Sequence, residues 1–258
     1  MSAHQIPQIL QQRVALLYMT GLSITSVARE LNIGRTSCWN ALRRRSLARD
    51  NTSIPRLVDH TFFDTIDTEA KAYWLGFLTA DGHVNDRSVR LQLANKDTAH
   101  IHLFAKALGS THSISSSGGK SQIAISSRKL ATSLQLLGFD TNKTETAHPV
   151  TLAPQLERHY WRGLVDGDGS VSWLTSTRHR GGRMAWVRLV GTAKIVDGFT
   201  AFVNKTINIY VKRQKHSSIW VVDYRCKSAK RVAKLLYASA TIALPRKQGT
   251  ARKMWNGA

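Results

Sequence analysis

The sequence predicts an α+β protein in which a small all-α module precedes two similar halves. A nine-residue stretch occurs at 74–82 and again at 161–169, and both copies end in an aspartate between a small residue and a glycine. The residues after each copy repeat in the same order at an offset of 98, the pairs being Val89 with Val187, Lys96 with Lys194, and Phe104 with Phe202. Repetition over this length indicates duplicated structural units.

The N-terminal module, residues 1–48, has the spacing of three short helices. The first is expected at 9–18 and the second at 24–31, where Ser23 suits the N-cap and apolar residues follow helical spacing. A tight turn leads into a third helix at 35–45. The pattern resembles the DNA-binding helix-turn-helix, in which the third helix reads DNA. That resemblance implies five DNA contacts, from Arg35, Thr36, Asn40, Arg43 and Arg44. The polar residues 49–66 are predicted to be a linker.

The sequence of each half predicts the element order αββαββα. The first half is expected at 67–146 and the second at 147–258, where it ends in a basic C-terminal tail. Val89–Leu93 and Gln122–Ser126 alternate as strands with one buried face, and helices are expected at 98–108 and 128–137. The motif acids are only 87 residues apart, so the second half carries about eleven extra residues before its second strand. These fall in 172–186 and predict a longer, basic hairpin whose contacts with DNA would come from Arg178, Arg180 and Arg183.

Small residues recur at a spacing of four within both motif helices. Gly76 precedes Ala80, and Gly163 precedes Gly167, so each pair lies on one helix face and allows two backbones to approach closely. If the helices pack through these faces, with Gly76 and Gly163 at the interface, the aspartates that follow emerge side by side. Two neighbouring carboxylates repel each other, and a fold tolerates them where the site serves divalent metal or substrate phosphate chemistry.

Both stretches resemble the LAGLIDADG motif of homing endonucleases. The resemblance implies two curved sheets forming a DNA-binding saddle, with Asp81 and Asp168 as metal ligands and the carbonyls of Ala80 and Gly167 completing the coordination of Mg²⁺ or another divalent metal such as Mn²⁺. It also implies catalytic basic or polar residues where a strand meets a helix, which are Ser126, Arg128, Arg225 and Lys227. Lys143 resembles a phosphate contact of the family. The first motif departs from the pattern in carrying Thr79 where the second carries Asp166.

The charge of the chain predicts a polyanionic partner. The formal net charge is +21 and the isoelectric point about 10.6, with +15 in residues 151–258. Further basic residues expected to contact DNA are Arg90, Arg188, Lys212 and Arg213. Two cysteines are too few for a disulfide framework, and no signal peptide or membrane span is evident. We therefore expect a monomeric protein of the cytoplasm, nucleoid or an organellar matrix, not a secreted one.

These features together predict a site-specific endonuclease that makes a metal-dependent double-strand break in DNA. Two alternatives use the same scaffold: a non-cleaving DNA-binding regulator and an RNA maturase that assists intron splicing. The presence of both motif acids argues against the regulator. The N-terminal helix-turn-helix pattern favours duplex DNA over RNA, because the major groove of A-form RNA is too narrow for a recognition helix.

Overall fold

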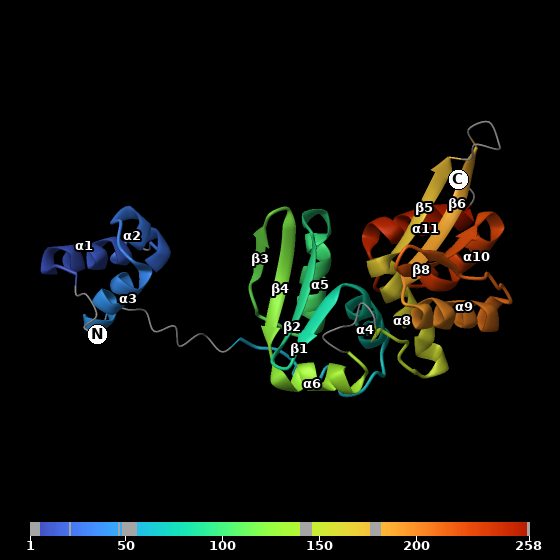
Figure 1. The fold of residues 1–258 in the computed structure, drawn as a ribbon, viewed down its shortest axis with the longest axis horizontal. Helices are drawn as coiled ribbons and strands as arrows, with labels where there is room; N and C mark the ends of the chain where they lie inside the picture. Colours follow the sequence, from blue (N-terminus) through green and yellow to red (C-terminus); the bar gives the residue numbers. More distant parts are fainter. Residues whose placement is uncertain are drawn as a thin grey trace. The chain divides into compact units, whose positions relative to one another are not determined.

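A computed structural model describes residues 6–20, 22–45, 47, 56–139, 146–175 and 182–256 (Figure 1). The chain divides into two compact units, residues 1–55 and 56–258. The first unit contains helices α1 (Gln8–Met19), α2 (Ile24–Glu30) and α3 (Arg35–Arg44). Its core joins Val14, Val27, Cys38 and Leu42 from the three helices. The Ser23 hydroxyl accepts a hydrogen bond from the backbone of Ser26 and caps α2.

The second unit consists of two halves with the same order of elements, as predicted. The first half contains α4 (Glu69–Asp81), β1 (Gly82–Asn85), β2 (Ser88–Ala94), the short 3₁₀ helix η1 (Asn95–Asp97), α5 (Thr98–Ala107), β3 (Ile114–Ser117), β4 (Lys120–Ser126) and α6 (Arg128–Leu136). The second contains α8 (Pro154–Asp168), β5 (Gly169–Thr175), β6 (Arg183–Gly191), α9 (Ala193–Ile207), β7 (Gln214–His216), β8 (Ile219–Arg225), α10 (Cys226–Tyr237) and α11 (Pro245–Asn256). The antiparallel sheets have the matching orders β1-β2-β4-β3 and β5-β6-β8-β7.

Each sheet has one face covered by helices and one open face. In β2, Val89, Leu91 and Leu93 are buried, whereas Arg90 and Gln92 between them are exposed. The same alternation places Val187 and Leu189 of β6 in the core. Because successive side chains of a strand point to opposite faces, the arginines and glutamines lie on the open face. The core is continuous across the two halves.

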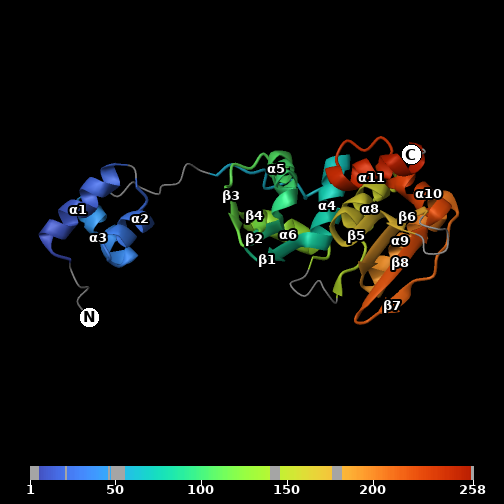
Figure 2. The same cartoon turned by 90° about the horizontal axis from the view of Figure 1, so that it is seen from above.

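Helices α4 and α8 lie side by side between the two sheets (Figures 1 and 2). A Cβ atom added to Gly76 would lie 1.9 Å from the carbonyl oxygen of Tyr160, and one added to Gly163 would lie 2.1 Å from that of Tyr73. Both distances are far below van der Waals contact, so neither position accepts a side chain. The predicted close approach of the two motif helices is confirmed.

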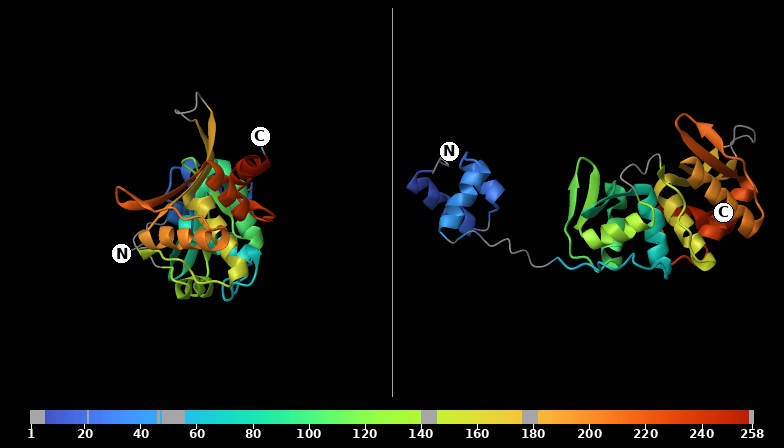
Figure 3. Two further views of the ribbon diagram at one scale, coloured as in Figure 1. Left: turned by 90° about the vertical axis from the view of Figure 1, so that its right-hand side faces the viewer. Right: turned by 60° about the horizontal axis from the view of Figure 1, so that its bottom comes forward.

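The second hairpin is longer than the first, as the offset between the halves predicts. Gly82 pairs with Leu91 and Gly169 with Leu189, so both hairpins start in the same register. The second ladder then continues to Thr175 opposite Arg183, past the part of β6 that pairs with β8 (Figure 3). The predicted DNA contacts Arg178 and Arg180 lie outside the described residues, as does Lys143.

The predicted linker of 49–66 is too long, because residues 56–66 are part of the second unit. In this segment, Phe62 and Phe63 are buried in the core and pack edge to face. The backbone of Asp59 also donates to the carbonyl of Leu108. A segment with so few apolar residues has no strand or helix periodicity, and its two adjacent aromatics became core residues only through the tertiary fold.

The predicted basic tail of the second half is in fact a packed helix, α11. Ala251 and Met254 are fully buried against the rest of the second half. At its start, the Arg246 guanidinium makes an ion pair of 3.1 Å with Asp97 in the first half. The few apolar residues of this segment are separated by charged and polar ones and give a weak helical pattern, although Ala251 and Met254 share one buried face. The C-terminal helix therefore connects the two halves as well as completing one of them.

The Gly163→Ala substitution tests the helix contact. We expect it to lower the free energy of unfolding by about 3 kcal/mol, because the methyl group forces the two backbones apart. Urea unfolding followed by circular dichroism measures the change. Gly249 in α11 is the matched control, since an added Cβ meets nothing within 4 Å there. Gly249→Ala should leave stability unchanged or raise it by about 0.5 to 1 kcal/mol. Equal stability of both variants would contradict the close contact.

Candidate catalytic centre and DNA-facing surface

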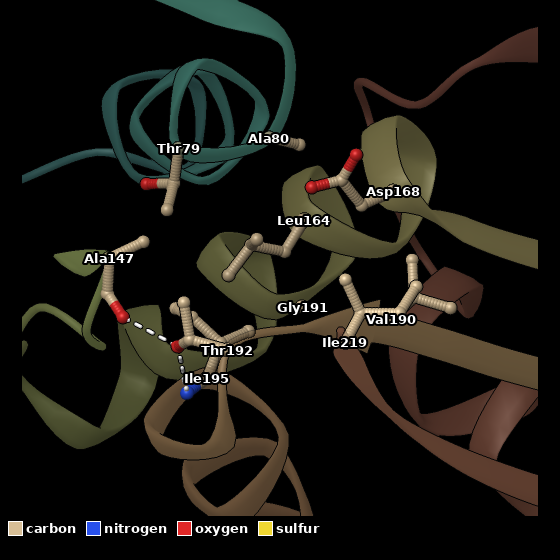
Figure 4. Close-up of a pocket in the computed structure, with 10 residues that line it drawn as sticks. All are labelled: Thr79, Ala80, Ala147, Leu164, Asp168, Val190, Gly191, Thr192, Ile195 and Ile219. Atoms are coloured by element: carbon tan, nitrogen blue, oxygen red, sulfur yellow. Dashed lines mark hydrogen bonds between the residues drawn. The ribbon is translucent and has the colours of Figure 1, made fainter. Parts of the chain in front are cut away.

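Asp81 and Asp168 are the last residues of α4 and α8, and the close helix contact brings these ends together. A Cβ atom added to Gly167 would lie 2.3 Å from the Cβ of Ala80 and 3.1 Å from Oδ2 of Asp81. The Asp81 carboxylate thus lies against the residue just before Asp168. In Figure 4 the Asp168 carboxylate points from the end of α8 toward α4. The predicted juxtaposition of the two acids and of Ala80 with Gly167 is present.

A cleft of about 250 Å³ opens beside Asp168 (Figure 4). Thr79 and Ala80 line it from α4, and the second sheet contributes Val190 and Ile219. Most of this lining is apolar. The acid therefore stands at the edge of a hollow bounded by aliphatic side chains and helix ends.

Lys247 of α11 is a buried cation that binds the C-terminal end of α8. Its ammonium donates hydrogen bonds of 2.7 Å to each of three carbonyl oxygens, on Val165, Asp166 and Gly169. These carbonyls end the helix, where the helix dipole favours positive charge. Burial lowers the Lys247 pKa to about 8, against the opposing fields of Asp166, Asp81 and Asp168. Lys247 therefore places a positive charge near both motif acids. It was not among the predicted site residues, because the sequence showed only a basic tail.

Asp166 is buried and structural in this protein. Its Oδ1 accepts a hydrogen bond of 2.6 Å from Tyr237, and its Oδ2 accepts bonds from the backbone of Leu244 at 2.7 Å and from Tyr73 at 2.8 Å. Burial raises the Asp166 pKa, although these hydrogen bonds and the Lys247 charge oppose the shift. At the equivalent position of the first motif, Thr79 donates to the carbonyl of Leu75 in its own helix. Asp166 thus depends on Tyr237 and Leu244, which lie at the end of α10 and just before α11.

The residues predicted at the strand-to-helix junctions are separated from Asp81 and Asp168 by several residues along the strands. They are Ser126, Arg128, Arg225 and Lys227. Gly82, next to Asp81, is level with Leu91, whereas Ser126 is level with Ser88, three residues further along β2. In the second half, Arg225 pairs with Trp186, three residues from Leu189. Three residues span about 10 Å of strand. The structure therefore does not gather Ser126, Arg128, Arg225 and Lys227 around the motif acids. Lys247, in contrast, is close enough to interact electrostatically with both of them.

Comparison with solved structures identifies the fold. The meganuclease I-SmaMI bound to uncleavable DNA matches with a TM-score of 0.52 and 13% identity, over 74% of this chain and 89% of that one. The LAGLIDADG meganuclease I-AabMI bound to uncleaved DNA matches with 0.51 and 10%, over 71% and 88%. I-GzeII, a LAGLIDADG homing endonuclease in complex with its DNA target, matches with 0.50 and 12%, over 74% and 92%. The fold is that of the LAGLIDADG homing endonucleases. No family model matches the sequence, and no curated protein matches it either.

On this LAGLIDADG scaffold, the predicted DNA-binding residues occupy different faces. Arg90 and Arg188 lie on the open faces of the two sheets. Arg183 instead shares the helix-covered side with Ala185 and lies over the Trp173 ring at 5.7 Å. The alternation of β6 therefore places Arg183 and Arg188 on opposite faces of the strand, and a DNA contact by Arg183 stays a prediction.

The remaining candidates differ in how they are held. Arg213 makes an ion pair with Asp197 and lies 4.3 Å from the centre of the Trp220 ring, and Lys212 precedes it. In the N-terminal unit, Arg35, Thr36, Arg43 and Arg44 of α3 are exposed and Asn40 is half-buried. An exposed α3 is compatible with a DNA contact, which stays a prediction. Among the described residues, no helix is both long and apolar enough to span a membrane.

His100 joins the two halves through a buried chain of hydrogen bonds. Tyr73 donates to Asp166, so His100 Nε2, at 2.7 Å from the Tyr73 oxygen, must donate to it. This leaves His100 Nδ1 as the unprotonated nitrogen, which is buried without a hydrogen-bond partner among the described residues. Protonating Nδ1 would create a buried, unpaired N–H group. Burial accordingly lowers the His100 pKa from 6.5 to about 4.

This lowered pKa predicts acid sensitivity of the fold. Between pH 6.5 and 4 the unfolded state binds more protons at His100 than the folded state, so stability falls as the pH falls through this range. Moving from pH 7 to pH 5 should remove about 2 kcal/mol of unfolding free energy through this residue. His100→Gln keeps a donor for Tyr73 and cannot titrate. Urea unfolding at both pH values should show a smaller loss for the variant, and an equal loss in both proteins would refute the assignment to His100.

Proposed function

We propose that this protein is a site-specific DNA endonuclease that hydrolyses one phosphodiester on each strand of a duplex target in the presence of a divalent metal. The observation that carries the proposal is the meeting of Asp81 and Asp168 at the ends of two helices in backbone contact, midway between two sheets with open faces. Each half would serve one strand, because two similar halves match the pseudo-two-fold symmetry of a duplex. The similarity to DNA-bound LAGLIDADG endonucleases supports this assignment.

The side chains present suit a hard divalent cation such as Mg²⁺ or Mn²⁺. Asp81 and Asp168 supply carboxylate oxygens, and the backbone carbonyls of Ala80 and Gly167 lie in the same two helix ends. Oxygen ligands of this kind are the ones that Mg²⁺ prefers, completed by water and substrate phosphate. No group of three or more His, Cys, Asp or Glu side chains gathers among the described residues. Such a site therefore depends on carbonyls, water and DNA for its remaining ligands.

A metal held there would supply a water nucleophile at neutral pH and neutralise charge on the scissile phosphate. The protein positions it by fixing the two helix ends. Lys247 contributes by binding the carbonyls of Val165, Asp166 and Gly169, which holds the last turn of α8 in place. Its positive charge also offsets the repulsion between the two acids and favours a phosphate nearby.

Charge supports duplex DNA as the substrate. Most of the net positive charge lies in residues 151–258, and binding should weaken steeply as salt rises because released counterions drive it. We propose that the N-terminal unit extends the DNA footprint through α3. We further propose that the protein acts as a monomer, because a single chain contains both halves.

The direct experiment is cleavage of a random-duplex library with Mg²⁺ or with EDTA, followed by sequencing of the ends. Discrete ends that need Mg²⁺ support the endonuclease. Enrichment of bound duplexes without cut ends in Mg²⁺ or Mn²⁺ would favour the DNA-binding regulator. Selection of structured RNA but of no duplex would favour the maturase.

Substituting either motif acid should separate cleavage from binding. We expect Asp81→Asn and Asp168→Asn to reduce double-strand cleavage at least a thousandfold, because each removes a charged metal ligand, while duplex affinity changes less than threefold. Cleavage of a labelled target and gel-shift titration measure the two effects. Asp86→Asn, at an exposed position in the turn between β1 and β2, is the matched control and should cut normally. Normal double-strand cleavage by either motif variant would refute the metal assignment.

A further inference from the structure

Three side chains form a hydrogen-bonded cluster on the open face of the second sheet. Arg188 of β6 pairs across the ladder with Asp223 of β8, and Trp186 lies on the same face of β6. The Asp223 carboxylate accepts bonds from Arg188 Nε at 2.7 Å and Nη2 at 2.8 Å, and from Trp186 Nε1 at 2.8 Å. The guanidinium also lies 4.6 Å from the centre of the Trp186 ring. We call these three residues the arginine clamp.

The arginine clamp uses only one of the two hydrogen-bonding edges of the guanidinium. A guanidinium carries one pair of parallel N–H groups along its side, from Nε and one Nη, and a second pair at its end, from both Nη atoms. Asp223 occupies the side pair. The end pair has no hydrogen-bond partner among residues 56–139, 146–175 and 182–256. It is therefore free to bind a ligand while the side chain is held still.

The clamp is charged at neutral pH. Burial of Asp223 opposes ionisation, but hydrogen bonds from Arg188 and Trp186 outweigh it and lower the Asp223 pKa. The same hydrogen bond raises the Arg188 pKa. Arg225 lies near the same carboxylate, with Nη2 at 3.5 Å from Oδ2. The carboxylate thus remains an acceptor, and the arginine remains oriented, under conditions where DNA is bound.

The first half lacks this clamp at the equivalent register. Arg90 occupies the position of Arg188, but its partner across the ladder is Ala124, and Ser88 stands where the second half has Trp186. Arg90 is exposed and makes no ion pair among the described residues. The two arginines therefore differ in restraint, although both lie on open sheet faces.

A carboxylate on a DNA-facing surface weakens attraction to phosphates, so the clamp is unsuited to charge neutralisation alone. It gives an arginine of fixed direction, which loses little side-chain entropy on binding. Two parallel N–H donors match the O6 and N7 acceptors of guanine in the major groove, the commonest specific contact of arginine with a base. We propose that Arg188, held by Asp223 and Trp186, reads one guanine of the DNA target. This inference rests on the duplex-DNA binding of the proposed function and does not depend on cleavage.

The test is selection of bound duplexes from a random library in EDTA, with the full chain, for the wild type and its variants. Arg188→Lys keeps the charge and loses the two parallel donors, so the preference for guanine at one base pair should fall roughly tenfold or more. Asp223→Ala should likewise reduce the preference for guanine at that base pair. It should also tighten binding to an unrelated duplex, because it removes a negative charge facing DNA. Arg90→Lys is the matched control and should leave that base pair unaffected. Circular dichroism and thermal unfolding confirm that each variant is folded.

In Asp223→Ala, the preference for guanine should fall while the affinity for an unrelated duplex rises. These opposite changes distinguish base reading from a structural role. If Arg188→Lys and Asp223→Ala are folded and keep the wild-type preference at every base pair, the inference is wrong. It is equally wrong if Asp223→Ala weakens binding to all duplexes alike. If the wild type selects no duplex, the proposed function fails, and the inference fails with it. A Trp186→Phe variant keeps the ring and removes one donor to Asp223, and it should show the same loss at the same base pair to a smaller degree.

Discussion

Backbone contact between α4 and α8 determines the arrangement of the second unit. The carbonyl oxygens of Tyr73 and Tyr160 occupy the space where side chains at Gly163 and Gly76 would lie. No larger residue permits this approach, so the distance between the helices is set by backbone atoms that cannot rearrange. The two sheets follow directly from the ends of these helices, with β1 and β5 beginning at the next residue. The spacing of the sheets and the meeting of Asp81 with the end of α8 therefore have the same physical origin.

Helices α4 and α8 each end in an aspartate, and because these two ends meet, negative potential accumulates there. The helix C-termini add to it, since their unpaired carbonyls carry partial negative charge. The C-terminal segment offsets this potential in the second half. Lys247 binds the carbonyls of Val165 and Asp166 in α8 and of Gly169 just after it. The Asp166 side chain accepts hydrogen bonds from Tyr73, Tyr237 and the backbone of Leu244. The buried charges are thus paired and hydrogen-bonded, which is the condition under which a protein interior tolerates them.

The two halves share a topology but differ in what their open faces present. The first half offers an arginine without an ion-pair partner among the described residues, whereas the second holds Arg188 against a carboxylate and an indole. A duplicated scaffold that binds an asymmetric partner needs such differences, because identical faces would select a palindromic sequence. Function on this fold therefore resides in side chains placed on equivalent strands, and the architecture alone does not specify it.

The sequence by itself determined the duplicated αββαββα order, the close helix pair and the meeting of the two acids, because each depends on local periodicity or on glycine spacing that only one packing satisfies. The longer second hairpin also followed from residue counting. Only the tertiary structure decided the packing of Phe62, Phe63 and α11, the position of Lys247 under the motif acids, and the face on which Arg183 lies. These depend on contacts between segments far apart in the chain, such as Lys247 with Val165, which leave no periodic signal. The physical reason is that local geometry is encoded in neighbouring residues, whereas the partner of a buried charge is chosen by the whole fold.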